Sequence, residues 1–284
     1  MVETIVGQPR LAGIDSPSQR NMPIFRWLRE RRRKEILAQP FPDSWRAVLE
    51  QHVAHWPYLD VGERVLLQQL VQVFVVEKNW EGCGGLEMTD EIRVTIAGLA
   101  CLLVLGLEHD LYRRVDSILV YPSTVVAPAR HAAVSRQLVI EKAAVPISGE
   151  AMLGGPVLLV WDAVRRDAVH PERGHNVVFH EFAHKLDMLD GTIDGMPPLA
   201  DRAQYERWVE VCTREYRELQ RQAASKRATF LDHYAGTNVG EFFAVVTETF
   251  FEQPVAMRRR HSDLYAVLQG FYRQDPAARQ ARSA

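Results

Sequence analysis

Cysteine is scarce in this 284-residue chain, and there is no excess of positive charge and no long apolar run. The three cysteines form no CxxC pair, which argues against a cysteine-based metal or redox motif and favours a reducing compartment. Lys and Arg total 34 against 36 Asp and Glu, so charge does not favour direct nucleic-acid binding. The longest mostly apolar run, residues 94–107, is shorter than the roughly 20 residues of a membrane span. Since no signal-peptide pattern is present either, we expect a cytoplasmic protein.

The length and the pattern of the sequence predict one main domain with two flanking segments. A chain of this length can bury one continuous core. We expect a basic, flexible leader at 1–40, a single domain at 41–276 that divides into a helical lobe at 41–110 and a catalytic part at 111–276, and a tail at 277–284. The arginine-rich part of the leader is read as a solvated helix or tail, with an anionic surface or a partner as the alternative contact.

The periodicity of the apolar residues predicts an α+β fold. Helical spacing dominates residues 42–107 and returns at 202–226. Between these helical segments, residues 118–121 and 157–161 are short apolar runs bounded by Pro, Gly and Ser, as is typical of strands. We therefore expect a small mixed sheet beside an N-terminal helical lobe, with an edge strand that offers main-chain hydrogen bonds to an extended peptide.

The most informative stretch is HEFAH at residues 180–184. In a helix, residues i and i+4 share a face, so His180 and His184 can both reach one zinc ion at about 2.0–2.1 Å. Glu181 then stands beside the metal as a general base for its bound water. The motif predicts half of a zinc-hydrolase site, against the alternative of two ordinary surface histidines.

The residues around the motif supply the helix that it needs. Asn176 is a plausible N-cap, and Gly191 is a plausible end. An apolar stripe recurs at helical spacing on another face than the histidines: Val178, Phe182, Leu186 and Leu189. We expect this helix to bury its apolar back and to present its metal-binding front.

A catalytic zinc site needs a third protein ligand. The candidates are Asp187, Asp190, Asp194, His233 and Glu241. A metzincin pattern requires glycine where this chain has Asp187, and on a continued helix Asp190 would point away from the metal. Asp194 lies in a GTxD sequence like that of aspzincins and stays an alternative.

Glu241 is the favoured third ligand because it opens a very apolar helix, in which an unpartnered carboxylate is costly to bury. The rival explanation is a capping-box-like pair with Asn238 that only ties down the helix start. Asp187 shares the metal face, and we expect it to accept a hydrogen bond from a ligand imidazole and so to fix its tautomer. The alternative for Asp187 is a solvent-exposed helix carboxylate.

Two long motifs in this order resemble those of the Mlc titration factor A family of bacterial zinc peptidases. The first is HEFAHKLD at residues 180–187. The second is Tyr234 followed, after six residues, by EFFAVxxE at residues 241–248. That family is similar in its catalytic core to the anthrax lethal factor group of gluzincins. The resemblance runs from about Pro42 to Pro276, and it implies a zincin-like metallopeptidase core built around the HExxH active-site helix.

The resemblance also implies the roles of individual residues. By that resemblance His180, His184 and Glu241 bind one Zn2+ ion, and Glu181 is the catalytic carboxylate. Tyr234 is implied to point its hydroxyl at the metal, where it would donate to the developing oxyanion, with a structural tyrosine as the alternative.

Glu248 lies seven residues beyond the third ligand, on the same helical face. We expect it either to support a ligand from behind or to be a surface acid.

The expected function is zinc-dependent hydrolysis of peptide bonds, aminopeptidase-like by the resemblance, with a peptide as substrate. The resemblance also implies a protein partner, a transcriptional repressor of sugar uptake of the Mlc type. The alternative is a regulatory protein-binding module in which hydrolysis is incidental. A metal-free pseudoenzyme is a third hypothesis, which the intact motif disfavours.

Overall fold

The computed structural model describes residues 23–107, 110, 112–123, 155–225 and 228–283. Its first part comprises α1 (Pro23–Leu37), α2 (Asp43–His52), η1 (Trp56–Tyr58), α3 (Val61–Glu77), β1 (Asn79–Gly82), α4 (Asp90–Leu103), β2 (Ser117–Tyr121) and β3 (Val157–Val160). Its second part comprises α6 (Trp161–Val169), η2 (Pro171–Arg173), α7 (Val177–Asp187), η3 (Met188–Asp190), α8 (Arg202–Ala224), η4 (His233–Gly236), α9 (Val239–Glu252), α10 (Pro254–Arg260), α11 (Ser262–Tyr272) and α12 (Pro276–Ser283). Helices dominate beside a small sheet, which confirms the expected α+β class.

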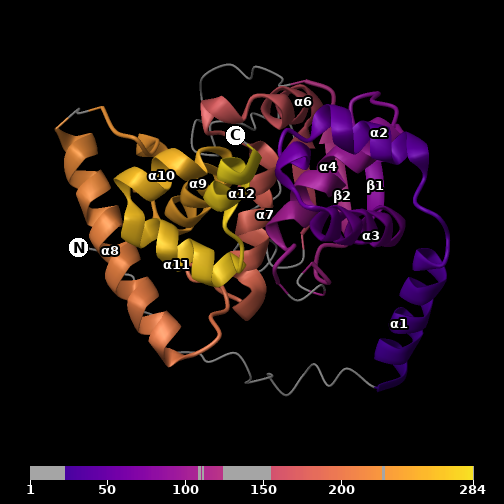
Figure 1. The fold of residues 1–284 in the computed structure, drawn as a ribbon, viewed down its shortest axis with the longest axis horizontal. Coiled ribbons are helices and arrows are strands. Elements are labelled where there is room, and N and C mark those ends of the chain that lie inside the picture. The colour runs from indigo at the N-terminus through magenta and orange to yellow at the C-terminus, as the bar shows by residue number, and fades with distance from the viewer. Residues whose placement is uncertain (1–22, 108–109, 111, 124–154, 226–227, 284) are drawn as a thin grey trace.

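The HExxH helix α7 lies at the centre of the fold. In Figure 1 it runs between the half that carries α2–α4 and the sheet and the half that carries α8–α12. It packs against α4 on one side and α9 on the other. Its apolar stripe is buried, with Val178, Phe182 and Leu186 fully covered. The metal helix is therefore held by both halves of the molecule.

The sheet has three strands in the order β1-β2-β3, and both described pairs are parallel. The expectation of a mixed sheet is therefore wrong for the described residues. Ile118 pairs with Trp80 on one side and Val157 on the other. The sequence did not predict β1, because Asn79–Gly82 contains only one large apolar side chain and becomes a strand by pairing with the buried β2. Trp161, predicted to end β3, instead begins α6, since the chain bends there and Asp162 N donates to Pro122 O at 3.3 Å.

The helical lobe is built on α4, whose side chains are buried from Ile92 to Leu103 except at Arg93. Thr89 caps this helix by accepting the backbone N–H of Ile92 at 3.3 Å. Gly98 allows α2 to approach closely, since a methyl group there would lie 2.7 Å from Leu49 Cδ2. α4 in turn packs against the HExxH helix α7. Among the described residues no helix combines the length and the apolar character that a bilayer span requires.

Both ends of the described chain are more ordered than the sequence predicted. Residues 1–22 of the predicted leader lie outside the described residues, but residues 23–37 form α1. Arg33 of this helix pairs with Glu77 at 2.8 Å. The predicted tail after residue 276 is wrong: it forms α12, in which Ala277 is buried and Arg279 pairs with Glu63 at 2.6 Å. Each end is fastened by an arginine whose partner lies far away in sequence, so local composition gave no signal for it.

Candidate metal centre

The HExxH helix begins and ends where its sequence predicts. Asn176 Oδ1 accepts the backbone N–H groups of Val178 and Phe179, each at 3.2 Å, and so caps two free donors at the helix start. At the other end η3 tightens the last turn, and Gly191 follows with a φ of 103°. That left-handed conformation favours glycine and stops the helix. The cap and the stop together fix which face of α7 carries the two histidines.

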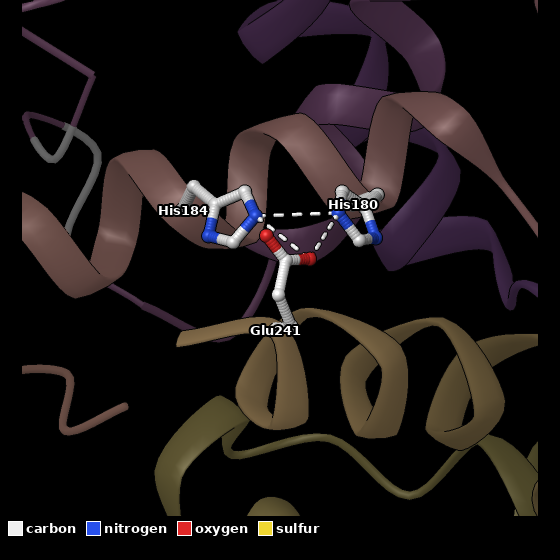
Figure 2. A group of neighbouring side chains, drawn as sticks. All are labelled: His180, His184 and Glu241. Atoms are coloured by element: carbon white, nitrogen blue, oxygen red, sulfur yellow. Dashed lines mark hydrogen bonds and ion pairs between the residues drawn. The ribbon is translucent and has the colours of Figure 1, made fainter. Parts of the chain in front are cut away.

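The third candidate ligand comes from α9, which faces α7. Asn238 caps α9 by accepting the backbone N–H of Glu241 at 2.9 Å. The cap predicted as a rival role for Glu241 is therefore provided by the asparagine side chain. The Glu241 carboxylate extends toward α7 instead, as Figure 2 shows.

The three side chains converge on one point. Nε2 of His180 lies 3.2 Å from Nε2 of His184, and Oε2 of Glu241 lies 3.1 Å from the first of these nitrogens and 3.6 Å from the second (Figure 2). A tetrahedral zinc ion with bonds of about 2.0–2.1 Å has edges of about 3.3–3.4 Å between its ligand atoms. The observed triangle has edges of that size. Among the described residues, this is the one group of His, Cys, Asp and Glu side chains arranged to hold a metal ion.

The electrostatics of the triangle also suit a cation. Burial raises the pKa of Glu241, but the imidazoles of His180 and His184 outweigh burial and bring that pKa to about 2. Burial lowers the pKa of His180, but Glu241 and Glu248 outweigh it and raise that pKa to about 10. Each group is thus stabilised in the charged form by the other, and a divalent cation would take the place of the imidazolium proton. Two imidazoles and one carboxylate are the ligand set of a catalytic zinc site with one open position.

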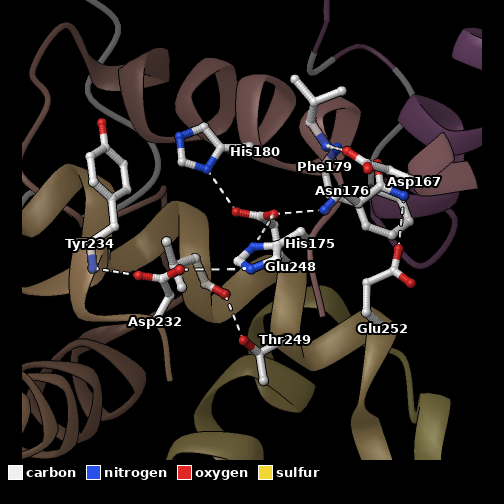
Figure 3. Close-up of polar contacts among 12 residues, drawn as sticks. Asp167, His175, Asn176, Phe179, His180, Asp232, Tyr234, Glu248, Thr249 and Glu252 are labelled. Carbon is white, nitrogen blue, oxygen red and sulfur yellow. Dashed lines mark hydrogen bonds and ion pairs between the residues drawn. The ribbon is translucent and has the colours of Figure 1, made fainter. Parts of the chain in front are cut away.

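Glu248 supports His180 from behind, as one of its two predicted roles required. Nδ1 of His180 donates to Oε1 of Glu248 at 2.7 Å, and Asn176 N donates to the other carboxylate oxygen at 2.7 Å (Figure 3). The Glu248 side chain is only 2% exposed. With Nδ1 engaged by Glu248, Nε2 is the nitrogen that faces Glu241 and would bind a metal ion once its proton is displaced. The alternative of a surface acid is wrong.

Asp187 has another role than the sequence predicted. Its fully buried carboxylate accepts the backbone N–H of Gly195 at 3.0 Å and of Met196 at 2.9 Å. Among the described residues it accepts no hydrogen bond from an imidazole, and it is not an exposed helix carboxylate. Burial raises the pKa of Asp187 and the two backbone donors lower it, but burial outweighs them and leaves this pKa at about 7. Asp187 therefore holds the loop that follows α7 rather than a ligand tautomer.

Tyr234 stands beside His180. Asp232 caps η4 by accepting the backbone N–H of Tyr234 at 2.8 Å, and the tyrosine ring centre lies 6.2 Å from that of His180 (Figure 3). Burial and the nearby Glu241 charge raise the pKa of Tyr234 to about 12. The hydroxyl group is therefore a hydrogen-bond donor at neutral pH. Glu181 directly follows His180 on α7 and is partly exposed, and its charge contributes to the raised pKa of both His180 and Tyr234.

The remaining candidate ligands lie in other contacts. Asp190 accepts the backbone N–H and the hydroxyl of Thr192, at 3.0 and 2.8 Å. Asp194 accepts the backbone N–H of Met196 at 3.2 Å, and His233 is exposed. The part of the chain that the structure describes brings none of the three into the metal group.

Glu252 and His175 also contact residues of this site, but the sequence did not single them out. Nδ2 of Asn176 donates to Oε1 of Glu252 at 2.8 Å (Figure 3), so the helix cap is itself held by α9. His175 lies 3.8 Å from Glu248 and 3.7 Å from Asp232. The sequence could have indicated Glu252, because it lies one helical turn after Glu248 in the apolar segment that forms α9. It could not indicate the partners of these two acids, which lie about 70 residues earlier in the chain.

Comparisons with known proteins identify the family of this chain. The glucose-regulated metallo-peptidase M90 family matches residues 26–273. An uncharacterised protein of Synechocystis is 38% identical over 251 residues, which cover 88% of this chain and 90% of the relative. Proteins called Mlc titration factor A are 31% identical: that of Serratia proteamaculans covers 79% of this chain and 85% of its own, and that of Klebsiella pneumoniae 78% and 83%. The match begins at residue 26 and so includes most of α1, whereas the motif resemblance begins only at about Pro42. The chain belongs to the glucose-regulated metallo-peptidase M90 family.

Proposed function

We propose that this protein is a zinc-dependent metallopeptidase of the gluzincin type, in which His180, His184 and Glu241 hold one Zn2+ ion. The observation that carries the proposal is the triangle of their ligand atoms, with edges of 3.1 to 3.6 Å. The side chains of the three residues are 4%, 14% and 16% exposed, so the site is shielded but still reached by solvent. Zinc bound there would lower the pKa of a water molecule toward about 7 and polarise a scissile carbonyl group.

Glu181 is the proposed general base. It follows His180 directly on α7, and its charge acts on both sides of the site. Its carboxylate would take the proton of the attacking water and pass it to the leaving amine. Tyr234, kept protonated by its raised pKa, would donate its hydroxyl hydrogen to the oxyanion that develops on the carbonyl oxygen. The chain thus supplies an acid–base group and a separate oxyanion donor.

Peptides are the proposed substrates, and aminopeptidase-like cleavage is proposed from the family resemblance. The test is Glu181→Gln, assayed for zinc content and for hydrolysis of chromogenic amino-acid and peptide substrates. We expect bound zinc to be kept and kcat to fall at least about 100-fold. The matched control is Glu206→Gln, which removes an exposed carboxylate paired with Arg202 at 2.7 Å and should leave activity unchanged. A Glu181→Gln variant that binds zinc and cleaves as fast as the wild type would exclude the mechanism.

A second candidate function is regulatory, and the observation that favours it is the name Mlc titration factor A of the 31% identical relatives. In this hypothesis the protein binds a transcriptional repressor of the Mlc type in the cytoplasm, and hydrolysis is incidental. Binding of purified Mlc-type repressor to wild type and to Glu181→Gln distinguishes the two. Equal binding by both, without cleavage of any peptide in a library, would favour the regulatory function over the enzymatic one.

A further inference from the structure

We infer that Asp187 is a positioning residue for Glu241, because it holds the loop of residues 191–196 against the first turn of α9. The inference rests on the proposed zinc site and adds to it. His180 and His184 are one turn apart on the same helix, so α7 alone sets their spacing. Glu241 belongs to another helix, and its place depends on how the start of α9 is fixed relative to the end of α7. Asp187 is the last residue of α7.

The carboxylate of Asp187 fastens the end of the loop. It accepts two consecutive backbone N–H groups, one on each oxygen: Gly195 N at 3.0 Å from Oδ2 and Met196 N at 2.9 Å from Oδ1. Gly195 is also held from its carbonyl side, since Trp208 Nε1 donates to Gly195 O at 3.1 Å. Asp187 is 0% exposed and Trp208 is 1% exposed. The position of Gly195 is therefore defined by buried contacts from both α7 and α8.

The fastened loop lies directly against the residues that precede Glu241. A methyl group on Gly195 would lie 2.4 Å from the carbonyl oxygen of Val239, and one on Gly240 would lie 2.8 Å from Ile193 Cγ2. The same methyl group on Gly240 would lie 3.6 Å from Asp187 Oδ2. The loop of residues 191–196 thus contacts α9 at Val239 and Gly240, the two residues before Glu241. A shift of the loop would move the first turn of α9 and change the ligand triangle.

A buried carboxylate is costly to keep unless its partners compensate for the lost hydration. Here the compensation comes from two loop N–H groups rather than from an imidazole. Asp187 therefore acts on the metal site through the backbone of the loop 191–196, and its effect reaches Glu241 on α9. Loss of an outer partner of a metal ligand typically lowers metal affinity about 10- to 100-fold.

The first test is Asp187→Asn, measured by zinc affinity in competition with a chelator at a temperature where the variant is folded. The amide keeps the size of the side chain but can accept on one atom only, so one loop N–H loses its partner. We expect zinc affinity to fall about 10- to 100-fold. In a Glu241→Ala background the same substitution should change zinc affinity by less than about twofold, since the residue on which it acts is absent. A purely structural role would give the same loss in both backgrounds.

The second test is a matched pair of glycines and covers the case in which Asp187→Asn does not fold. Gly191 and Gly195 have φ angles of 103° and 71°, so alanine strains the backbone at either position. At Gly191 a methyl group meets nothing within 4 Å, whereas at Gly195 it meets Val239. We expect Gly195→Ala to weaken zinc binding at least about 10-fold and Gly191→Ala to keep it within about twofold. Circular dichroism confirms that each variant is folded.

Failure of the positioning role and failure of the zinc site give different results. If folded Asp187→Asn or Gly195→Ala binds zinc as tightly as the wild type, the positioning role is wrong while the zinc site stands. If the wild type binds zinc no more tightly than Glu241→Ala, the proposed zinc site itself fails.

Discussion

Nδ1 of His180 donates a hydrogen bond of 2.7 Å to Glu248, and the other oxygen of that carboxylate accepts the backbone N–H of Asn176 at 2.7 Å. One buried side chain of α9 thus holds both a candidate ligand and the cap of the helix that carries it. Because the carboxylate accepts at both oxygens, it orients the imidazole and fixes its tautomer. The helices α7 and α9 thus carry both the candidate ligands and the contact that orients His180.

Replacing Glu248 with Gln should weaken zinc binding about 10- to 100-fold, because the amide presents a donor where one of the two acceptors is needed. Zinc affinity by chelator competition measures the effect. Glu252→Gln is the matched control, one turn later on α9 and bonded to the Asn176 side chain at 2.8 Å. The amide oxygen of glutamine at this position can still accept the hydrogen bond from Asn176 Nδ2. Equal losses of zinc affinity in both variants would contradict the role of Glu248.

Replacing Tyr234 with Phe should lower kcat about 100-fold with little change in KM or zinc affinity, since its hydroxyl acts on the developing oxyanion. The pKa of Tyr234 is raised to about 12, so the donor stays protonated across the working range. The ratio of wild-type to variant kcat should therefore be constant from pH 6 to pH 9. A ratio that falls toward 1 within this range would show that the hydroxyl does not act as a protonated donor.

The stability of the fold should fall in acid because of His55, which is buried between Phe179 of α7 and Phe251 of α9. Burial lowers the pKa of this imidazole from 6.5 to about 4, so the folded state keeps it neutral. Below pH 6.5 the unfolded chain binds a proton that the folded chain does not. The contribution of His55 is fully present above pH 6.5 and is lost as pH falls toward 4, by up to roughly 3 kcal/mol.

His55→Gln tests this because the amide can still donate to Phe251 O, which lies 3.3 Å from His55 Nε2, but cannot titrate. Urea unfolding at pH 7 and pH 4.5 gives the free energy of unfolding. The wild type should lose more of it than the variant between the two pH values. The same pH slope in both proteins would rule out the buried neutral imidazole as the cause.

The C-terminal helix should contribute measurably to stability. Arg279 is 7% exposed, and its guanidinium lies 2.6 Å from Glu63 and 2.9 Å from Gln274 Oε1. Arg279→Ala removes the donor to the buried Gln274 and to Glu63, whose side chain is 24% exposed, and should cost about 1–3 kcal/mol in urea unfolding. Arg282→Ala, at an exposed position in the same helix, should change stability by less than about 0.5 kcal/mol. A similar small effect at Arg279 would mean that α12 is not held by this pair.

The parts of the molecule that the sequence predicted are those encoded locally. HExxH spacing, the Asn176 cap and the stop at Gly191 depend on residues within two turns of one another. The sequence also favoured Glu241 as a ligand, because an isolated acid in an apolar helix needs a partner. These features follow from helix geometry and from the cost of burying charge.

The features that the sequence missed depend on residues far apart in the chain. Asp187 was expected to face an imidazole, since periodicity gives the face of a side chain but not which donor reaches it. The loop donors at Gly195 and Met196 come within range only after the chain turns back. Likewise β1 becomes a strand by pairing with β2, and α12 is ordered by Glu63, more than 200 residues earlier. Tertiary contacts override local pattern at each of these places.

The central claim is that His180, His184 and Glu241 together hold one zinc ion. The most direct measurement is the zinc content and zinc affinity of purified wild type, Glu241→Ala and the control Asp194→Asn, by mass spectrometric metal analysis and chelator competition. We predict one zinc ion per chain in the wild type and in Asp194→Asn, and a large loss of zinc from Glu241→Ala. Full zinc content with wild-type affinity in Glu241→Ala, or loss of zinc from Asp194→Asn alone, would contradict it.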